Sequence, residues 1–152
     1  FCLICCLIWL SASALTNQTA LAALRQQQGD NLSTTLELYL VEKDGTKRKI
    51  ENNQRIDRPA EIEWRITAKT KSKPVRNLKL ALPLPSGFRL SEKGIAINGG
   101  NQCQAHYLAF DGSELDENQL EKMSNTVRTL QLSCAAIEPN NAVVIVYRTK
   151  TR

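Results

Sequence analysis

The sequence predicts an all-β fold of the sandwich type, and three observations carry that prediction. Apolar and polar residues alternate with a period of two along most of the chain beyond residue 31, as in strands that bury one face. Turn-forming combinations of Gly, Pro, Asn and Asp recur between these runs, and beyond the leader helical spacing is confined to one short stretch, 115–123. We therefore expect about seven or eight antiparallel strands in two packed sheets, with one short helical turn in a loop.

The first predicted element is a hairpin. Leucines alternate with more polar residues over 36–40, and Asp44-Gly45 then supplies the left-handed backbone of a tight turn before the basic run 46–50. The next strand, 62–69, alternates between apolar and charged or polar residues, and Trp64 lies on its apolar face. We expect Trp64 to point into the core rather than to serve as a ligand-stacking platform.

The stretch NLKLALPLPSGFRL, 77–90, is predicted to be a strand that leaves the sheet at a corner. One face of it carries four leucines at alternate positions, Leu78, Leu80, Leu82 and Leu84. Pro83 and Pro85 remove two backbone donors, and Ser86-Gly87 supplies a turn, so the strand must end there at an edge or corner. Leu80, Leu82 and Phe88 are expected in the core, with Leu84 and Phe88 folded back over its end.

The remaining predicted strands are 88–97, 102–110, 126–134 and 142–150. The last of these is apolar on both faces, which is typical of a strand in the middle of a sheet. The helical turn over 115–123 is expected to start behind a capping pattern formed by Ser113 and Asp116.

The chain begins with an uncharged apolar run of ten residues followed by small residues. This pattern predicts a secretory signal over 1–14, with a second small-x-small site that would place the cut as late as residue 22. The run is too short for a comfortable membrane span, although an uncleaved anchor is the alternative. Residues 15–31 are then a flexible leader, and 32–152 form the domain, which is expected in the periplasm or on the cell surface.

Two cysteines lie beyond the predicted signal, Cys103 and Cys134. In an exported chain an even count predicts a disulfide, which would stabilise the fold by roughly 3 to 4 kcal/mol. Two geometries are open. If strands 103–110 and 126–134 pair, Cys103 lies opposite Cys134 and Tyr107 opposite Leu130; otherwise the bridge joins the two sheets.

The chemistry-bearing residues do not form a recognisable catalytic or metal motif. His106 is the only histidine, and its position on an alternating strand favours a surface or edge residue over a general base. The acids of the 111–124 loop fit no calcium loop, and we expect solvated side chains rather than a metal site or a glycosidase pair. They are instead a candidate contact loop, namely Asp111, Glu114, Asp116 and Glu117. No catalytic residue and no cofactor is predicted.

The charge of the chain limits its partners. The net charge is +5, but the basic residues are spread along the chain and aromatic residues make up only 5%. Basic and aromatic residues do not interleave, which argues against nucleic-acid binding. A weak attraction to anionic envelope surfaces fits the charge better.

Four segments in order resemble the bacterial conserved-repeat domains, a family of unknown function, over about residues 32–150. They are RPAEIEWRIT, VRNLKLALPLPSGF, HYLAFDGSEL and IEPNNAVVIVYRTK. Asn140 and Asn141 stand where the family usually has Gly, and Ala109-Phe110 replace a Ser before Asp-Gly. The resemblance implies an immunoglobulin-like sandwich on secreted or surface proteins, and it supplies no catalytic residues.

We therefore expect a non-enzymatic exported module that is structural or binds a protein, for example by adding a strand to a partner. The alternative is a carbohydrate- or envelope-binding domain with the 111–124 loop and the basic turn 69–76 as its contact surfaces. A hydrolase that uses the loop carboxylates is the weaker alternative.

Overall fold

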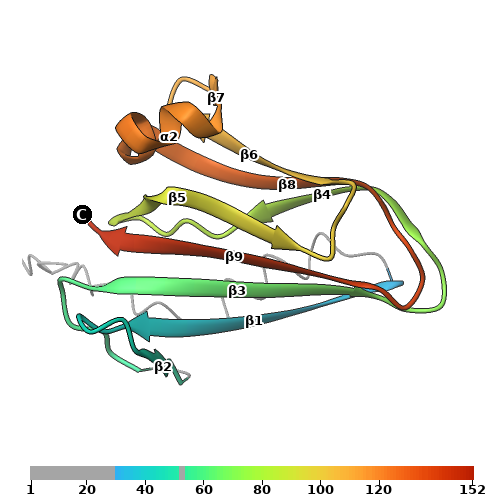
Figure 1. Cartoon of the computed structure of the whole chain (residues 1–152), viewed down its shortest axis with the longest axis horizontal. Helices are drawn as coiled ribbons and strands as arrows, with labels where there is room; N and C mark the ends of the chain where they lie inside the picture. The colour runs from blue at the N-terminus through green and yellow to red at the C-terminus, as the bar shows by residue number, and fades with distance from the viewer. Residues whose placement is uncertain (1–29, 52–53) are drawn as a thin grey trace, which may run out of the picture.

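Two antiparallel sheets pack against each other in the computed structural model (Figure 1), which describes residues 30–51 and 54–152. The predicted signal and nearly all of the predicted leader lie outside the described residues. In the five-stranded sheet the order is β2-β1-β3-β9-β5, formed by Lys47–Lys49, Leu32–Val41, Glu61–Thr70, Ala142–Thr151 and Phe88–Asn98. In the four-stranded sheet the order is β4-β8-β6-β7, formed by Val75–Leu82, Val127–Ile137, Cys103–Ala109 and Glu114–Leu115.

The predicted all-β class is confirmed. The last strand, β9, lies between β3 and β5, and its inner side chains alternate with half-buried ones, so the expected central position is also confirmed. This order differs from that of antibody domains, whose last strand belongs to the sheet opposite the first two.

The core lies between the sheets and contains every core residue expected from the sequence. Trp64, Leu80, Leu82 and Phe88 are 0%, 0%, 5% and 6% exposed. The indole of Trp64 stacks on the ring of its cross-strand partner Tyr147, with ring centroids 5.9 Å apart. Its Nε1 donates to Thr149 Oγ1 at 2.9 Å, so the buried indole keeps a hydrogen-bond partner.

The proline corner has the predicted form. Strand β4 ends at Leu82 and lies at the edge of its sheet, and Leu84 packs against the core that contains Phe88. The carbonyl of Pro83 accepts a hydrogen bond from Tyr147 Oη at 2.7 Å. The corner is therefore tied directly to β9, an interior strand of the other sheet.

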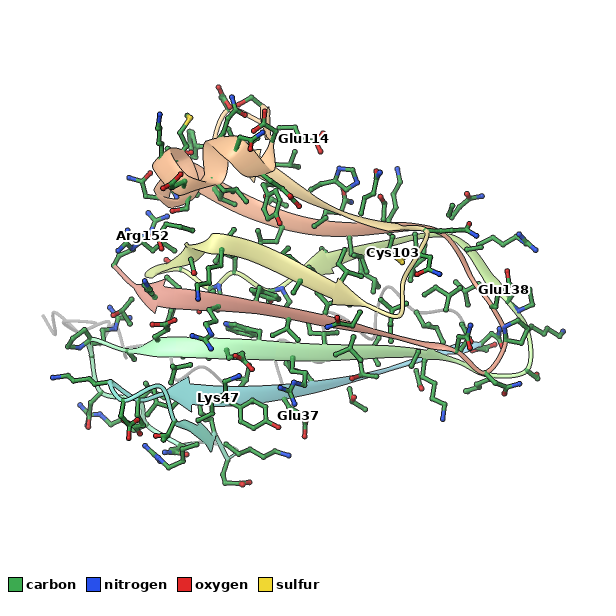
Figure 2. All side chains as sticks on the ribbon, viewed as in Figure 1. Glu37, Lys47, Cys103, Glu114, Glu138 and Arg152 are labelled. Carbon is green, nitrogen blue, oxygen red and sulfur yellow. A yellow bond between two sulfur atoms is a disulfide. The ribbon has the colours of Figure 1, made fainter. Side chains whose placement is uncertain are left out.

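The disulfide between Cys103 and Cys134 joins neighbouring strands of one sheet. The two residues are cross-strand partners in β6 and β8, Tyr107 lies opposite Leu130, and the Cα atoms of the cysteines are 4.0 Å apart. The alternative geometry, in which the bridge joins the two sheets, is wrong. In Figure 2 the bridge lies toward the end that carries Glu138, away from the helix.

The short helix α2, Glu117–Met123, begins later than the sequence suggested. Its N-cap is Asp116, which accepts from the Gln119 backbone while the Gln119 side chain accepts from the Asp116 backbone. Ser113 does not cap the helix, because its hydroxyl donates to Asp111 in the preceding turn. The cause is β7, which pairs Leu115 with Tyr107 and keeps the chain extended up to the cap.

Strand β5 breaks its pairing with β9 between Leu90 and Ile95, and Tyr107 repairs the break from the opposite sheet. The backbone N–H of Ile95 donates to Tyr107 Oη at 2.9 Å. Gly94 is left-handed (φ 65), and a Cβ there would come within 2.8 Å of the same hydroxyl. The Tyr107 hydroxyl therefore both accepts the free N–H of β5 and occupies the space that a side chain at position 94 would need.

Replacing Tyr107 with Phe should lower the free energy of unfolding by about 1 to 3 kcal/mol, because the buried Ile95 N–H loses its acceptor. Chemical denaturation measures this loss. Tyr39→Phe is the control, since the Tyr39 hydroxyl donates to Glu37 at a long 3.3 Å and its loss should change stability by less than about 0.5 kcal/mol. Equal losses in both variants would contradict the assignment.

Reduction of the disulfide, or the double variant Cys103→Ala with Cys134→Ala, should lower the unfolding free energy by about 3 to 4 kcal/mol. The reason is the entropy regained by the unfolded chain when the cross-link over 31 residues is opened. Denaturation with and without reductant measures the loss. The double variant should show no further response to reductant.

Candidate functional site

Three of the four acids of the predicted contact loop have local structural partners. Asp111 accepts from Ser113, Glu114 contacts His106, and Asp116 caps α2. Glu117 lies in the first turn of that helix. Hydrogen bonds from Ser113 lower the pKa of Asp111. In the described ranges no group of three or more His, Cys, Asp or Glu side chains could hold a metal ion.

The outer face of the five-stranded sheet carries many charges, but these neutralise one another. Glu63 lies on this face with a side chain only 3% exposed, and it receives Lys47 Nζ at 2.8 Å and Arg148 Nε at 3.1 Å. A neighbouring ion pair follows the same pattern, with Lys49 Nζ 2.7 Å from Glu37 Oε1. The alternation of β3 had suggested a polar outer face but not a buried carboxylate on it.

The ion pairs determine the protonation of Glu63. Burial would raise the pKa of Glu63, but hydrogen bonds and charge from Lys47 and Arg148 outweigh it and hold that pKa below its ordinary value. The carboxylate is therefore ionised and satisfied at neutral pH. A face whose cations are already bound to its own acids offers little to an external anion.

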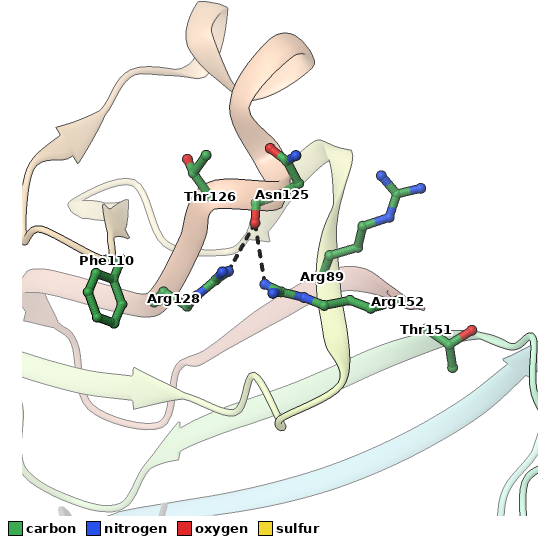
Figure 3. A pocket seen from close by; sticks show the side chains of 7 residues that line it. All are labelled: Arg89, Phe110, Asn125, Thr126, Arg128, Thr151 and Arg152. Atoms are coloured by element: carbon green, nitrogen blue, oxygen red, sulfur yellow. Dashed lines mark hydrogen bonds between the residues drawn. The ribbon is translucent and has the colours of Figure 1, made fainter.

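A different arrangement occurs at the end of the sandwich near α2, where cationic side chains gather around an open hollow of about 660 Å³. We call it the arginine groove; it is lined by Arg89, Phe110, Asn125, Thr126, Arg128, Thr151 and Arg152. Figure 3 shows Arg128 and Arg152 converging on the main-chain oxygen of Asn125, with the ring of Phe110 beyond Arg128. The side chains come from β5, β8, the β6–β7 turn, the β9 end and the 3₁₀ turn Ser124–Thr126.

The arginines of the groove keep donors free for a ligand. Arg128 Nη1 donates to Asn125 O at 2.9 Å, and Arg152 donates to the same oxygen at 3.3 Å and to Phe88 O at 3.2 Å. Arg128 Nη1 also donates to Val127 O at 3.1 Å. Each guanidinium has five N–H donors, so both retain donors that no described residue uses. Within the described part of the chain, none of the three arginines forms a salt bridge. Glu92 interacts with the charge of Arg89 at longer range but pairs with Lys150 at 3.6 Å.

Phe110 adds an apolar surface beside these charges. It is 88% exposed, which is unusual for a large aromatic residue without a partner. A flat ring next to guanidinium groups can pack against the apolar face of a ligand while the arginines bind its anionic groups. The arrangement supports binding, since the lining residues include no nucleophile paired with a base.

Little in the sequence indicated this groove. Phe110 appeared only as a departure from the resembling family, and the arginines come from strands far apart in the chain. The 69–76 turn, which was expected to be a contact surface, lies around the β3–β4 connection and contributes no residue to the groove.

Comparison with protein families, curated proteins and solved structures returns no match. Among the described residues, no helix is long and apolar enough to cross a membrane.

Replacing Glu63 with Gln should cost about 1.5 to 3 kcal/mol at pH 7, because Lys47 and Arg148 lose a charged acceptor. Folding lowers the pKa of the Glu63 carboxyl below its ordinary value of 4.5. The carboxylate therefore stabilises the protein fully at pH values above 4.5, and this stabilisation is lost as the pH falls through the lowered pKa. The stability gap between the wild type and the variant should therefore narrow in acid. Denaturation at several pH values tests this, with the exposed Glu138→Gln as control.

Proposed function

We propose that the protein is an exported module of the bacterial periplasm or cell surface that binds an anionic envelope glycan through the arginine groove. The observation that carries the proposal is the gathering of three arginines, none of which forms a salt bridge with a described residue, around a hollow that also presents an exposed phenylalanine. Guanidinium groups recognise carboxylate and phosphate through paired hydrogen bonds. The Phe110 ring offers the flat apolar surface against which a sugar ring packs.

Export is supported by the disulfide, since such bonds persist mainly in oxidising compartments. The bacterial envelope is suggested by the resemblance to the conserved-repeat domains. Both points concern where the protein works, whereas the groove concerns what it binds.

Strand addition to a partner receives less support from the geometry. Sheet edges that are short or irregular resist pairing with another chain. The edge strands β2 and β7 have three and two residues, and β5 breaks its register. The longer edge strand β4 carries Lys79 and a left-handed Asn77 (φ 51) that interrupts its pairing with β8.

The double variant Arg89→Ala with Arg128→Ala should weaken binding to an anionic polysaccharide, such as polygalacturonate, by at least about tenfold, because it removes charge-assisted hydrogen bonds. Phe110→Ala should weaken binding several-fold. Calorimetry or interferometry measures the affinity, which should fall as salt is raised.

The matched control is Lys73→Ala with Arg76→Ala, which removes the same charge from the 69–76 turn. If that control weakens binding as much, net charge rather than the groove is responsible. Equal binding of neutral dextran, or binding of phosphatidylglycerol vesicles without binding of the polysaccharide, would also overturn the proposal.

A further inference from the structure

A chain of hydrogen bonds crosses three strands of the four-stranded sheet, and none of its residues lines the arginine groove. His106 in β6 contacts Ser133 Oγ in β8 through Nε2 at 2.6 Å and Glu114 Oε1 in β7 through Nδ1 at 2.5 Å. Ser133 and His106 are half-buried, and Glu114 is exposed. Each ring nitrogen of the histidine therefore has a partner of a different kind.

The chemistry of the partners assigns the protons. A glutamate carboxylate at neutral pH only accepts hydrogen bonds, so Nδ1 of the neutral imidazole must carry the hydrogen and Nε2 must be the acceptor. Ser133 Oγ is then the donor to Nε2. This is the order of a nucleophile, a general base and a carboxylate that holds the base in one tautomer.

The serine is also open to a substrate. It lines a hollow of about 490 Å³ together with Asn77, Lys79, Gln102 and Gln104. Lys79 and Gln104 are the cross-strand partners of Ser133 on either side, so both side chains leave the same face of the sheet as the hydroxyl. An ammonium and an amide are thus available as donors to a negative oxygen that develops beside Oγ.

We propose that Ser133, His106 and Glu114 form a hydrolytic site for small carboxylic esters. Ser133 Oγ attacks the carbonyl carbon and its proton passes to His106 Nε2, which returns the proton to the leaving alcohol as the ester C–O bond breaks. Water then attacks the acyl-serine, His106 accepts its proton and returns it to Ser133 Oγ, and the carboxylic acid leaves. Ser133 and His106 are the catalytic residues, and Glu114 is a positioning residue. This activity would be additional to glycan binding, in a chain whose sequence predicts no enzyme.

The test is labelling with a fluorophosphonate probe, which forms a bond from Ser133 Oγ to phosphorus with loss of fluoride, followed by mass mapping of the adduct. Labelling should fall on Ser133 and disappear in Ser133→Ala, while the exposed Ser86→Ala control labels normally. His106→Gln should slow labelling and hydrolysis of p-nitrophenyl acetate by about 100-fold or more. Thermal unfolding of each variant reports whether the fold is intact.

The role of Glu114 is tested by rescue. Glu114→Gln should slow both reactions about tenfold, whereas Glu114→Asp, which keeps the carboxylate, should recover part of the rate. Absence of labelling in the folded wild type, labelling of another serine, or an unchanged rate in folded His106→Gln would overturn the proposal. None of these results would affect glycan binding, which is measured with different residues and a different ligand.

Discussion

The fold depends on the burial of alternate side chains between two sheets, and the stacked pair of Trp64 and Tyr147 lies at its centre. The two residues are neighbours on β3 and β9, the middle of the larger sheet. Burial raises the pKa of Tyr147 well above its ordinary value, so its hydroxyl stays protonated and can donate to Pro83. Tyr147 thereby connects the stacked pair in the larger sheet to the proline corner at which β4 leaves the smaller sheet.

A second tyrosine makes the corresponding link in the opposite direction. Tyr107 belongs to the smaller sheet, and its buried hydroxyl accepts from Ile95 in the larger one. Both contacts satisfy a backbone group where regular pairing fails, at a proline in one case and at a register break in the other. Buried backbone groups need such partners, and the two tyrosines supply them at these irregular places. Because the disulfide lies within one sheet, these contacts and apolar packing hold the two layers together.

The surface divides into regions that satisfy their own charges and regions that do not. Ion pairs cover the outer face of the larger sheet, where Glu63 is buried among cations. At the end near α2, by contrast, guanidinium groups are held by main-chain oxygens, which carry no net charge. Their positive charge is therefore not neutralised by a salt bridge with any described residue, which distinguishes the groove from the ion-paired outer face of the larger sheet.

Much of the fold was determined by local sequence. The alternation around Trp64, the proline after Leu82 and the turn glycine Gly45 each act within a few residues, because side-chain direction and backbone freedom are local properties. Asn140 adopts the left-handed conformation (φ 59) that its place in the turn requires.

Only the tertiary structure decided what lies side by side. The order of strands put Cys103 and Cys134 in one sheet, and the two-residue strand β7 moved the helix cap from Ser113 to Asp116. The same order brought together the arginines of the groove and the Ser133, His106 and Glu114 relay. Strand pairing joins residues that are far apart in the chain. The alternation of apolar and polar residues shows on which face of a sheet a residue lies, but it does not show which strand lies next to it. For that reason the core could be predicted from the sequence, whereas the candidate sites could not.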